Sequence, residues 1–146
     1  MRALGVDLGA VRVGLALSDP SKTIASPFET LPAGDVEAGD WPQRIAAAIA
    51  DVARANDVDT IVVGLPRSLA GRETAGASTA RRVAAALRAV TAASVELWDE
   101  RLSSVEAERT LVGAGQRRAT RRTTRDRVAA AIILQGWLQA RARPPS

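Results

Sequence analysis

Residues 2–18 read RALGVDLGAVRVGLALS, two apolar runs on either side of a short step at 9–10. The first run, 2–9, predicts a short buried strand with Asp7 near its end, and the second, 12–18, alternates well enough to predict another strand. Because the step between them is short, we expect an antiparallel hairpin. An ionised carboxylate in a buried run is costly unless it is paired or bound to a metal, so Asp7 is a candidate functional residue. A turn-capping Asp ahead of a glycine is the alternative.

The rest of the chain alternates predicted strands and helices. Pro27 indicates an extended segment at a sheet edge or a bulge, and Asp40 and Pro42 predict the N-cap and first turn of a helix. The segments are an extended stretch at 23–31, a loop at 32–40, helices at 41–55, 74–93, 103–115 and 125–141, and strands at 60–65 and 94–100. This order predicts one α/β domain over 1–146, ending in a short tail, with a mixed sheet covered by helices on both faces.

Composition excludes several chemistries. The 146 residues include no Cys and no His, which removes disulfides, thiolate nucleophiles, serine-triad catalysis and Cys- or His-ligated metals. An enzyme of this composition must use carboxylates, Arg, the single Lys22, hydroxyls or backbone groups, and oxygen ligands favour a hard metal such as Mg²⁺ or Mn²⁺. The lack of Cys fits a reducing, cytoplasmic compartment. No stretch approaches the roughly 18 apolar residues of a membrane span, so we expect no membrane partner.

Positive charge is concentrated in the last third of the chain. Residues 1–100 hold ten basic and 13 acidic side chains, net −3, whereas residues 101–146 hold ten and three, net +7. This asymmetry predicts a surface that faces a polyanion, with binding that weakens steeply as salt rises. A solvated loop in an Arg-rich chain is the alternative. The candidate phosphate contacts are Arg12, Arg67, Arg72, Arg101, Arg117, Arg118, Arg121, Arg122, Arg125 and Arg127.

Further acidic residues stand where predicted elements end or begin. Asp99 and Glu100 close the strand at 94–100, and since side chains alternate across a strand, only one of them shares a face with Asp7. Asp126 lies in the first turn of a helix, in line with its core-facing stripe. Turn capping by Asp99 and helix capping or dipole stabilisation by Asp126 are the alternative explanations.

These carboxylates meet only under a specific geometry. In a mixed α/β sheet, ligands gather outside the carboxyl ends of parallel strands. If the strands at 2–9 and 94–100 are parallel neighbours, Asp7 meets one residue of the Asp99-Glu100 pair there, and Asp126 joins them if its helix begins at the same edge. Three such carboxylates can bind two Mg²⁺ or Mn²⁺ ions for phosphodiester cleavage, one activating water and one stabilising the departing oxygen.

A rival interpretation uses the same hairpin. Asp7, Gly9 and Gly14 resemble the first phosphate motif of the actin-like ATPases, in which an Asp coordinates a metal-bound phosphate and glycines admit it to the turn. An actin-like ATPase needs two such domains around its nucleotide, and 146 residues supply only one. The architecture shared with the RNase H-like nucleases remains, and ATP binding would distinguish the ATPase.

Four motifs in order resemble one family over nearly the whole chain. They are GVDLGAVRVGLALSD at 5–19, VVGLPRSLAGRETAGAS at 62–78, DERLSSVEAE at 99–108 and RDRVAAAIILQGWL at 125–138. Together they resemble the YqgF family, also called RuvX, of Holliday-junction-resolvase-like proteins with an RNase H-like fold. The resemblance implies a bacterial cytoplasmic nuclease that processes the 5′ end of pre-16S ribosomal RNA. Cleavage of Holliday junctions or other branched nucleic acid is the older assignment for that family.

The resemblance also implies site residues. By position, the family's acidic residues fall on Asp7, on the Asp99-Glu100 pair and on Asp126, and analogy with related resolvases favours Glu100 over Asp99 as the metal ligand. The sequence departs from the family pattern at positions that could touch substrate. Those departures are Ala10 and Val11 in place of the common Thr and Lys, and Arg67, Ser68 and Leu69 in place of Leu-Asn-Met.

The expected partner is nucleic acid, either pre-rRNA or branched or single-stranded DNA. Aromatic residues are few and mostly in predicted core positions, so we expect recognition by backbone shape and charge. A junction resolvase needs two active sites and hence a homodimer, whereas an enzyme that trims RNA can work as a monomer. A catalytically idle nucleic-acid-binding module in ribosome maturation is the alternative to an enzyme.

Overall fold

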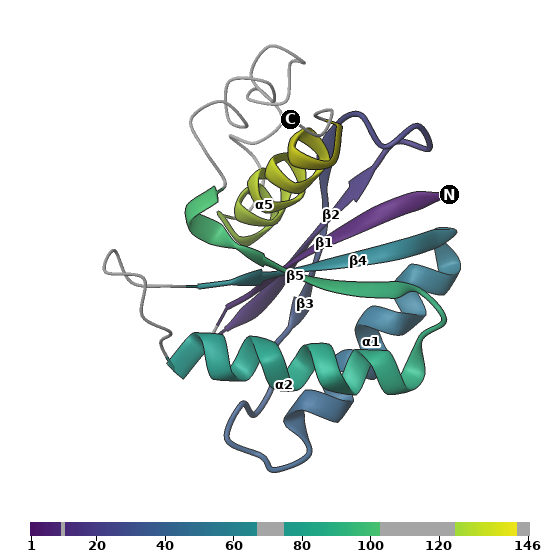
Figure 1. Ribbon diagram of the computed structural model, residues 1–146. Helices are drawn as coiled ribbons and strands as arrows, with labels where there is room; N and C mark the ends of the chain where they lie inside the picture. Colours follow the sequence, from purple (N-terminus) through teal and green to yellow (C-terminus); the bar gives the residue numbers. More distant parts are fainter. Residues whose placement is uncertain (10, 67–74, 103–124, 143–146) are drawn as a thin grey trace.

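The computed structural model has at its centre a five-stranded mixed sheet with the order β3-β2-β1-β4-β5 (Figure 1). It describes residues 1–9, 11–66, 75–102 and 125–142. The elements are β1 (Arg2–Leu8), β2 (Arg12–Ser18), β3 (Ala25–Pro32), α1 (Trp41–Ala55), β4 (Val58–Leu65), α2 (Ala75–Val90), β5 (Ser94–Asp99), the short 3₁₀ helix η1 (Glu100–Leu102) and α5 (Arg125–Ala142). The strands and helices predicted within these ranges are confirmed, whereas the helix predicted at 103–115 lies outside the described residues.

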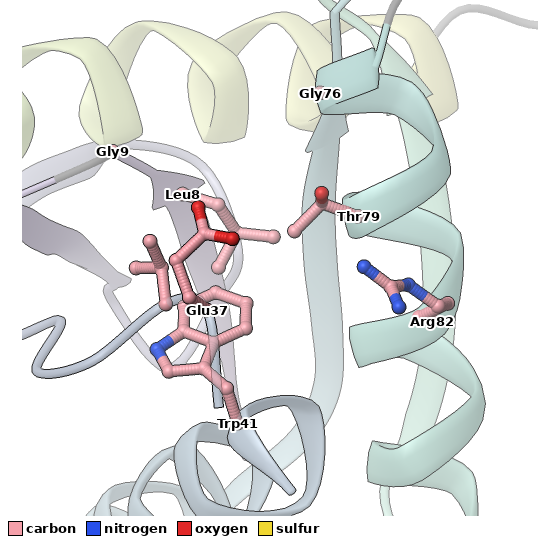
Figure 2. A pocket seen from close by; sticks show the side chains of 8 residues that line it. Leu8, Gly9, Glu37, Trp41, Gly76, Thr79 and Arg82 are labelled. Carbon is pink, nitrogen blue, oxygen red and sulfur yellow. The ribbon is translucent and has the colours of Figure 1, made fainter. Parts of the chain in front are cut away.

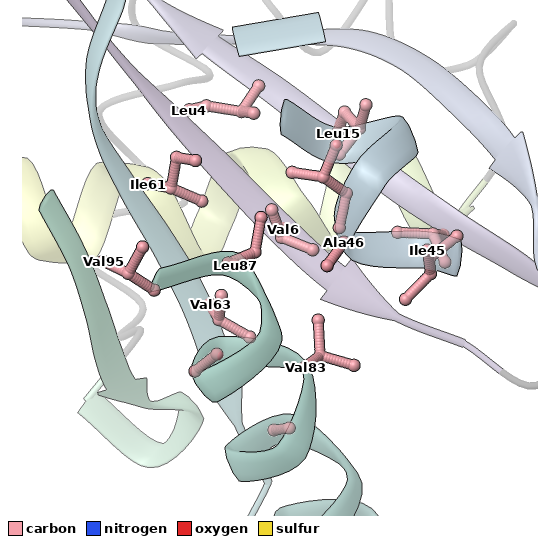
Figure 3. Close-up of a cluster of buried hydrophobic side chains, with 14 of the residues drawn as sticks. Leu4, Val6, Leu15, Ile45, Ala46, Ile61, Val63, Val83, Leu87 and Val95 are labelled. Carbon is pink, nitrogen blue, oxygen red and sulfur yellow. The ribbon is translucent and has the colours of Figure 1, made fainter. Parts of the chain in front are cut away.

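Helices cover both faces of the sheet, as the sequence predicts (Figure 1). Successive side chains of β1 point to opposite faces of the sheet. Leu4 and Val6 pack into the core beneath α1 and α2 (Figure 3), whereas Ala3 lies in the smaller core beneath α5. None of the helices in the described ranges is long and apolar enough to cross a membrane.

The sheet brings the carboxyl ends of three strands to one edge. β1 and β2 form the expected antiparallel hairpin, while β1 runs parallel to β4 and β4 runs parallel to β5. The strands that carry Asp7 and Asp99 are therefore parallel, but they are not neighbours, because β4 lies between them, so only part of the stated condition is met. Any contact between their carboxylates must cross β4.

The structure tests two local predictions, for Pro27 and for Asp40. β3 is an edge strand, and the register of β2 with β3 shifts between Leu15 and Ala16, where Ala16 pairs with Pro27. Pro27 therefore lies at an edge and beside a bulge, as predicted. Asp40 is at the N-cap position of α1, yet its side chain makes no capping hydrogen bond. Its Oδ1 instead lies 3.3 Å from Nε of Arg44 in an exposed ion pair. The predicted N-cap position of Asp40 and the proline in the first turn are confirmed.

Gly5 allows α5 to approach β1. A Cβ at this position would lie 2.8 Å from the carbonyl oxygen of Ala130 and 2.8 Å from Cβ of Leu134, so the helix itself would have to move. We expect Gly5→Ala to lower the free energy of unfolding by about 1–3 kcal/mol. Urea unfolding should show a lower midpoint with an unchanged slope. An unchanged midpoint would contradict the close approach.

Asp19 organises the turn between β2 and β3. Its Oδ1 accepts hydrogen bonds from the N–H groups of Thr23, at 2.7 Å, and Ile24, at 2.9 Å. The hydroxyl of Ser21 donates to Oδ2. Burial acts to raise the pKa of Asp19, but the hydrogen bonds outweigh it and lower the pKa from 3.8 to about 2.

The charge of Asp19 makes the free energy of unfolding depend on pH in the acid range. We expect Asp19→Ala to lower the free energy of unfolding at pH 7 by about 1–2 kcal/mol, because the N–H groups of Thr23 and Ile24 and the hydroxyl of Ser21 lose their charged acceptor. Since the folded pKa lies below the unfolded one, this contribution is complete above 3.8 and is lost as the pH falls through about 2. Urea unfolding of both proteins at several pH values measures it. A difference that stays constant down to pH 2 would contradict the role of the charge.

Candidate functional site

Asp7 lies near the carboxyl end of β1, on the face that α5 covers. Ala3 and Gly5 contact α5, and Asp7 continues this alternation. Its partner on β2 is Gly14. On β4, Gly64 follows Val63, the partner of Val6. The strands on both sides of Asp7 therefore carry a glycine at this level, and no neighbouring strand side chain covers its carboxylate.

Glu100 reaches Asp7 across β4. It is the first residue of η1, directly after β5, and its carboxyl group shares a side-chain hydrogen bond with Asp7. A Cβ on Gly64 would lie 2.9 Å from Oε1 of Glu100 and 3.4 Å from its Cγ. The Glu100 side chain thus passes directly over Gly64, and the absence of a side chain there makes the contact possible.

The electrostatics of the pair favour a bound cation. Burial raises the pKa of Glu100, the hydrogen bond with Asp7 acts to lower it, and the negative charge of Asp99 raises it further. Two carboxyl groups in contact cannot both stay charged at low cost without a proton or a cation between them. Carboxylate oxygens are the ligands that Mg²⁺ and Mn²⁺ prefer. The residues present therefore fit a hard divalent cation.

Asp99 lies on the other side of the sheet from this pair. Its partner on β4 is Leu65, which belongs to the core beneath α1 and α2. Of the two adjacent acidic residues, Glu100 is the one that the structure brings to Asp7. Among the described side chains, no three acidic groups gather closely enough to hold a metal ion. Asp99 therefore acts on the pair through its charge.

The backbone of Asp126 lies toward the same edge. Asp126 is the second residue of α5, and its side chain is outside the described part of the structure. Ala130 lies over Gly5, while Gln135 accepts a hydrogen bond of 2.8 Å from the N–H of Ala25, near the opposite edge. Asp126 lies about one helical turn before Ala130, in the direction of the carboxyl end of β1.

Among the ten candidate arginines, the structure describes the side chain of Arg12. Arg12 is exposed and begins β2, and its carbonyl accepts a 3.0 Å hydrogen bond from the N–H of Gly9. It stands at the edge where β1 ends, as expected. For three others the structure describes the backbone alone, in η1 and α5: Arg101, Arg125 and Arg127. The other six candidates lie outside the described residues: Arg67, Arg72, Arg117, Arg118, Arg121 and Arg122.

Sequence reasoning missed Gly64. The only signal was a glycine inside a β-branched run, in VVGLP at 62–66. Such a glycine often marks a close approach of another group. The approaching group, the Glu100 side chain, comes from a different strand end and is not evident from local sequence.

The strand order, the helices on both faces and the acidic residues at the carboxyl edge define the RNase H-like class. The fold is similar to a structure described as "T. thermophilus RuvC in complex with Holliday junction substrate", with a TM-score of 0.64 and 18% identity. That match covers 97% of this chain and 95% of RuvC. It confirms the predicted fold.

Sequence comparison places the chain within this class. The family model described as "RuvX: Holliday junction resolvase" matches residues 1–140. A protein of Anaeromyxobacter dehalogenans (strain 2CP-1 / ATCC BAA-258) is 47% identical over 142 residues, covering 97% of this chain and 99% of that protein. One of Myxococcus xanthus (strain DK1622) is 43% identical over 145 residues, covering 99% and 91%. Both are named "Putative pre-16S rRNA nuclease". The chain belongs to the RuvX family.

Proposed function

We propose that this chain is a divalent-metal-dependent nuclease that hydrolyses phosphodiester bonds at the 5′ end of pre-16S ribosomal RNA. The observation that carries the proposal is the contact between Asp7 and Glu100 at the carboxyl edge of the sheet. The RNA substrate is supported by the name of relatives that are 43% and 47% identical over nearly the whole chain. The processing of the 5′ end follows from the motifs that resemble this family.

Different residues of the chain are proposed to bind the metal and the substrate phosphate. Asp7, Glu100 and Asp126 are the proposed ligands of Mg²⁺ or Mn²⁺. When bound, such ions activate water and stabilise the departing oxygen of a phosphodiester. Asp99 adds negative charge beside Glu100 without entering the ligand set. Arg12, exposed at the same edge, is positioned to bind a substrate phosphate. The chain has no His, so no imidazole moves protons here.

A cleavage panel tests this function. Precursor 16S RNA, single-stranded RNA and DNA, and a four-way DNA junction are incubated with Mg²⁺, Mn²⁺ or EDTA. We expect cleavage of the precursor RNA with either metal and none with EDTA. Binding of the nucleic acids without metal-dependent cleavage of any of them would support an idle binding module instead. Saturable ATP binding at millimolar concentration would support the actin-like alternative.

The family model's description favours a second candidate, a Holliday junction resolvase. A resolvase must cut two strands and therefore needs two active sites, which requires a homodimer. We expect such a protein to cut the junction in preference to RNA and to sediment as a dimer. A monomer that cuts only RNA would exclude this candidate.

A further inference from the structure

A cavity lies at the carboxyl edge of the sheet, on the face opposite the Asp7-Glu100 pair. Its volume is about 370 Å³, within the range of small-molecule sites. The lining residues come from the end of β1, the loop before α1, the start of α1 and one side of α2, and they are Leu8, Gly9, Val36, Glu37, Trp41, Gly76, Thr79 and Arg82 (Figure 2). Because Leu8 directly follows Asp7, the cavity and the carboxylate pair lie at the same end of β1 but on opposite faces of the sheet.

Opposite charges face each other across this cavity. Figure 2 shows the Glu37 carboxylate and the Arg82 guanidinium directed into it from the loop before α1 and from α2. Both residues are exposed, and neither belongs to an ion pair found among the described residues. A ligand in the cavity that presents both hydrogen-bond donors and acceptors can contact the two opposite charges together.

The wall between the two charges is fixed. The indole N–H of Trp41 donates a 2.6 Å hydrogen bond to the carbonyl of Ala33, and the residue as a whole is 4% exposed. The hydroxyl of Thr79 donates to the carbonyl of Ala75 at 3.2 Å. The ring therefore forms a rigid, almost fully buried part of the lining, and polar groups of Glu37, Thr79 and Arg82 also line the cavity. A flat ligand with a polar edge matches this lining.

We propose that this cavity binds one unpaired nucleobase of the substrate strand, with Arg82 and Glu37 reading the hydrogen-bonding edge of the base. Guanine fits best, because its O6 and N7 accept from an Arg fork and its N1–H and N2–H groups donate to a carboxylate. The role in substrate recognition rests on the proposed nuclease function, since a strand held at Asp7 brings an adjacent nucleotide to this edge. Base binding itself does not depend on cleavage.

Binding is tested first without any reaction. The amide resonances of Gly9, Gly76 and Thr79 are followed in nitrogen–proton spectra while guanosine 5′-monophosphate is added to millimolar concentration. Ribose 5-phosphate is the matched probe without a base. We expect the nucleotide alone to shift these resonances, and we expect Glu37→Gln and Arg82→Ala to weaken the effect roughly tenfold each. Arg54→Ala, which removes an exposed charge from the last turn of α1, should leave it unchanged.

Two results would overturn base binding. Equal shifts with both probes indicate a phosphate contact only, and no shift at the cavity excludes the site. Thermal unfolding of each variant is measured alongside, so that a loss of binding is interpreted only in folded protein. Arg54→Ala serves as the control for the removal of one positive charge.

Recognition of the substrate is tested second, with cleavage. A series of RNA oligonucleotides is compared, each lacking one base at a different position. We expect the loss of the base at one position near the cut to lower kcat/KM roughly tenfold in the unmodified protein, but not in Arg82→Ala. The same sensitivity in both proteins means that the cavity does not read the substrate. If no nucleic acid is cleaved but the nucleotide still binds, the nuclease proposal fails while the base site stands.

Discussion

Asp7→Asn is expected to reduce metal-dependent cleavage by roughly 10²–10³-fold or more, the usual effect of removing one preorganised electrostatic group from an active site. An amide is neutral and weakens the binding of a divalent cation, yet it has the shape of the carboxylate and can donate to Glu100. The fold and the affinity for nucleic acid should therefore persist. Cleavage rates and anisotropy of a labelled oligonucleotide measure the two properties separately.

Asp99→Asn is the matched control for this change. It removes one carboxylate from the same edge, but from the opposite face of the sheet, since Asp99 pairs with Leu65 above the other core. We expect less than a tenfold loss, because Asp99 acts on Glu100 through charge. Equal losses in the two variants, or an Asp7→Asn protein that keeps a tenth of its activity, would contradict the assignment.

Within the described residues, the sequence was sufficient to predict the strands and helices, and it identified Asp7 as a candidate site residue. A carboxylate inside an apolar run is visible locally, and the alternation across a strand reduces Asp99 and Glu100 to one partner for Asp7. The order of the strands could not be predicted from the sequence, because the position of β4 between β1 and β5 depends on long-range pairing. The family resemblance already favoured Glu100 over Asp99, but a physical reason for that choice required the strand order, the end of β5 at Asp99 and the turn of η1 that follows.

The same limit applies to the cavity on the other face. Glu37 comes from the loop before α1 and Arg82 from α2, and in sequence each is an ordinary exposed charge. Only the packing of α1 and α2 on one face of the sheet brings them to the same space. Local patterns identify which residues are buried, whereas sites built from several elements require the tertiary arrangement.

Gly64→Ala is expected to lower cleavage roughly 10²-fold while the protein stays folded. The added Cβ would lie 2.7 Å from Cδ1 of Ile133 and 2.9 Å from Oε1 of Glu100. Both are ends of flexible side chains, so they can move aside at a cost of about 1–3 kcal/mol in stability. Movement of Glu100 by about 1 Å separates its carboxylate from Asp7, and misplacement on that scale costs on the order of 10²-fold in rate.

A second glycine separates this steric effect from the general effect of replacing Gly with Ala. Gly39→Ala adds a Cβ that meets nothing within 4 Å, and both changes reduce the freedom of the unfolded chain equally. We expect Gly39→Ala to retain full cleavage. In Gly64→Ala, the metal concentration that gives half-maximal rate should rise, which a loss of stability alone does not produce. If Gly64→Ala cleaves at the rate of Gly39→Ala, Glu100 does not need its place over β4, and the carboxylate pair is not the catalytic centre.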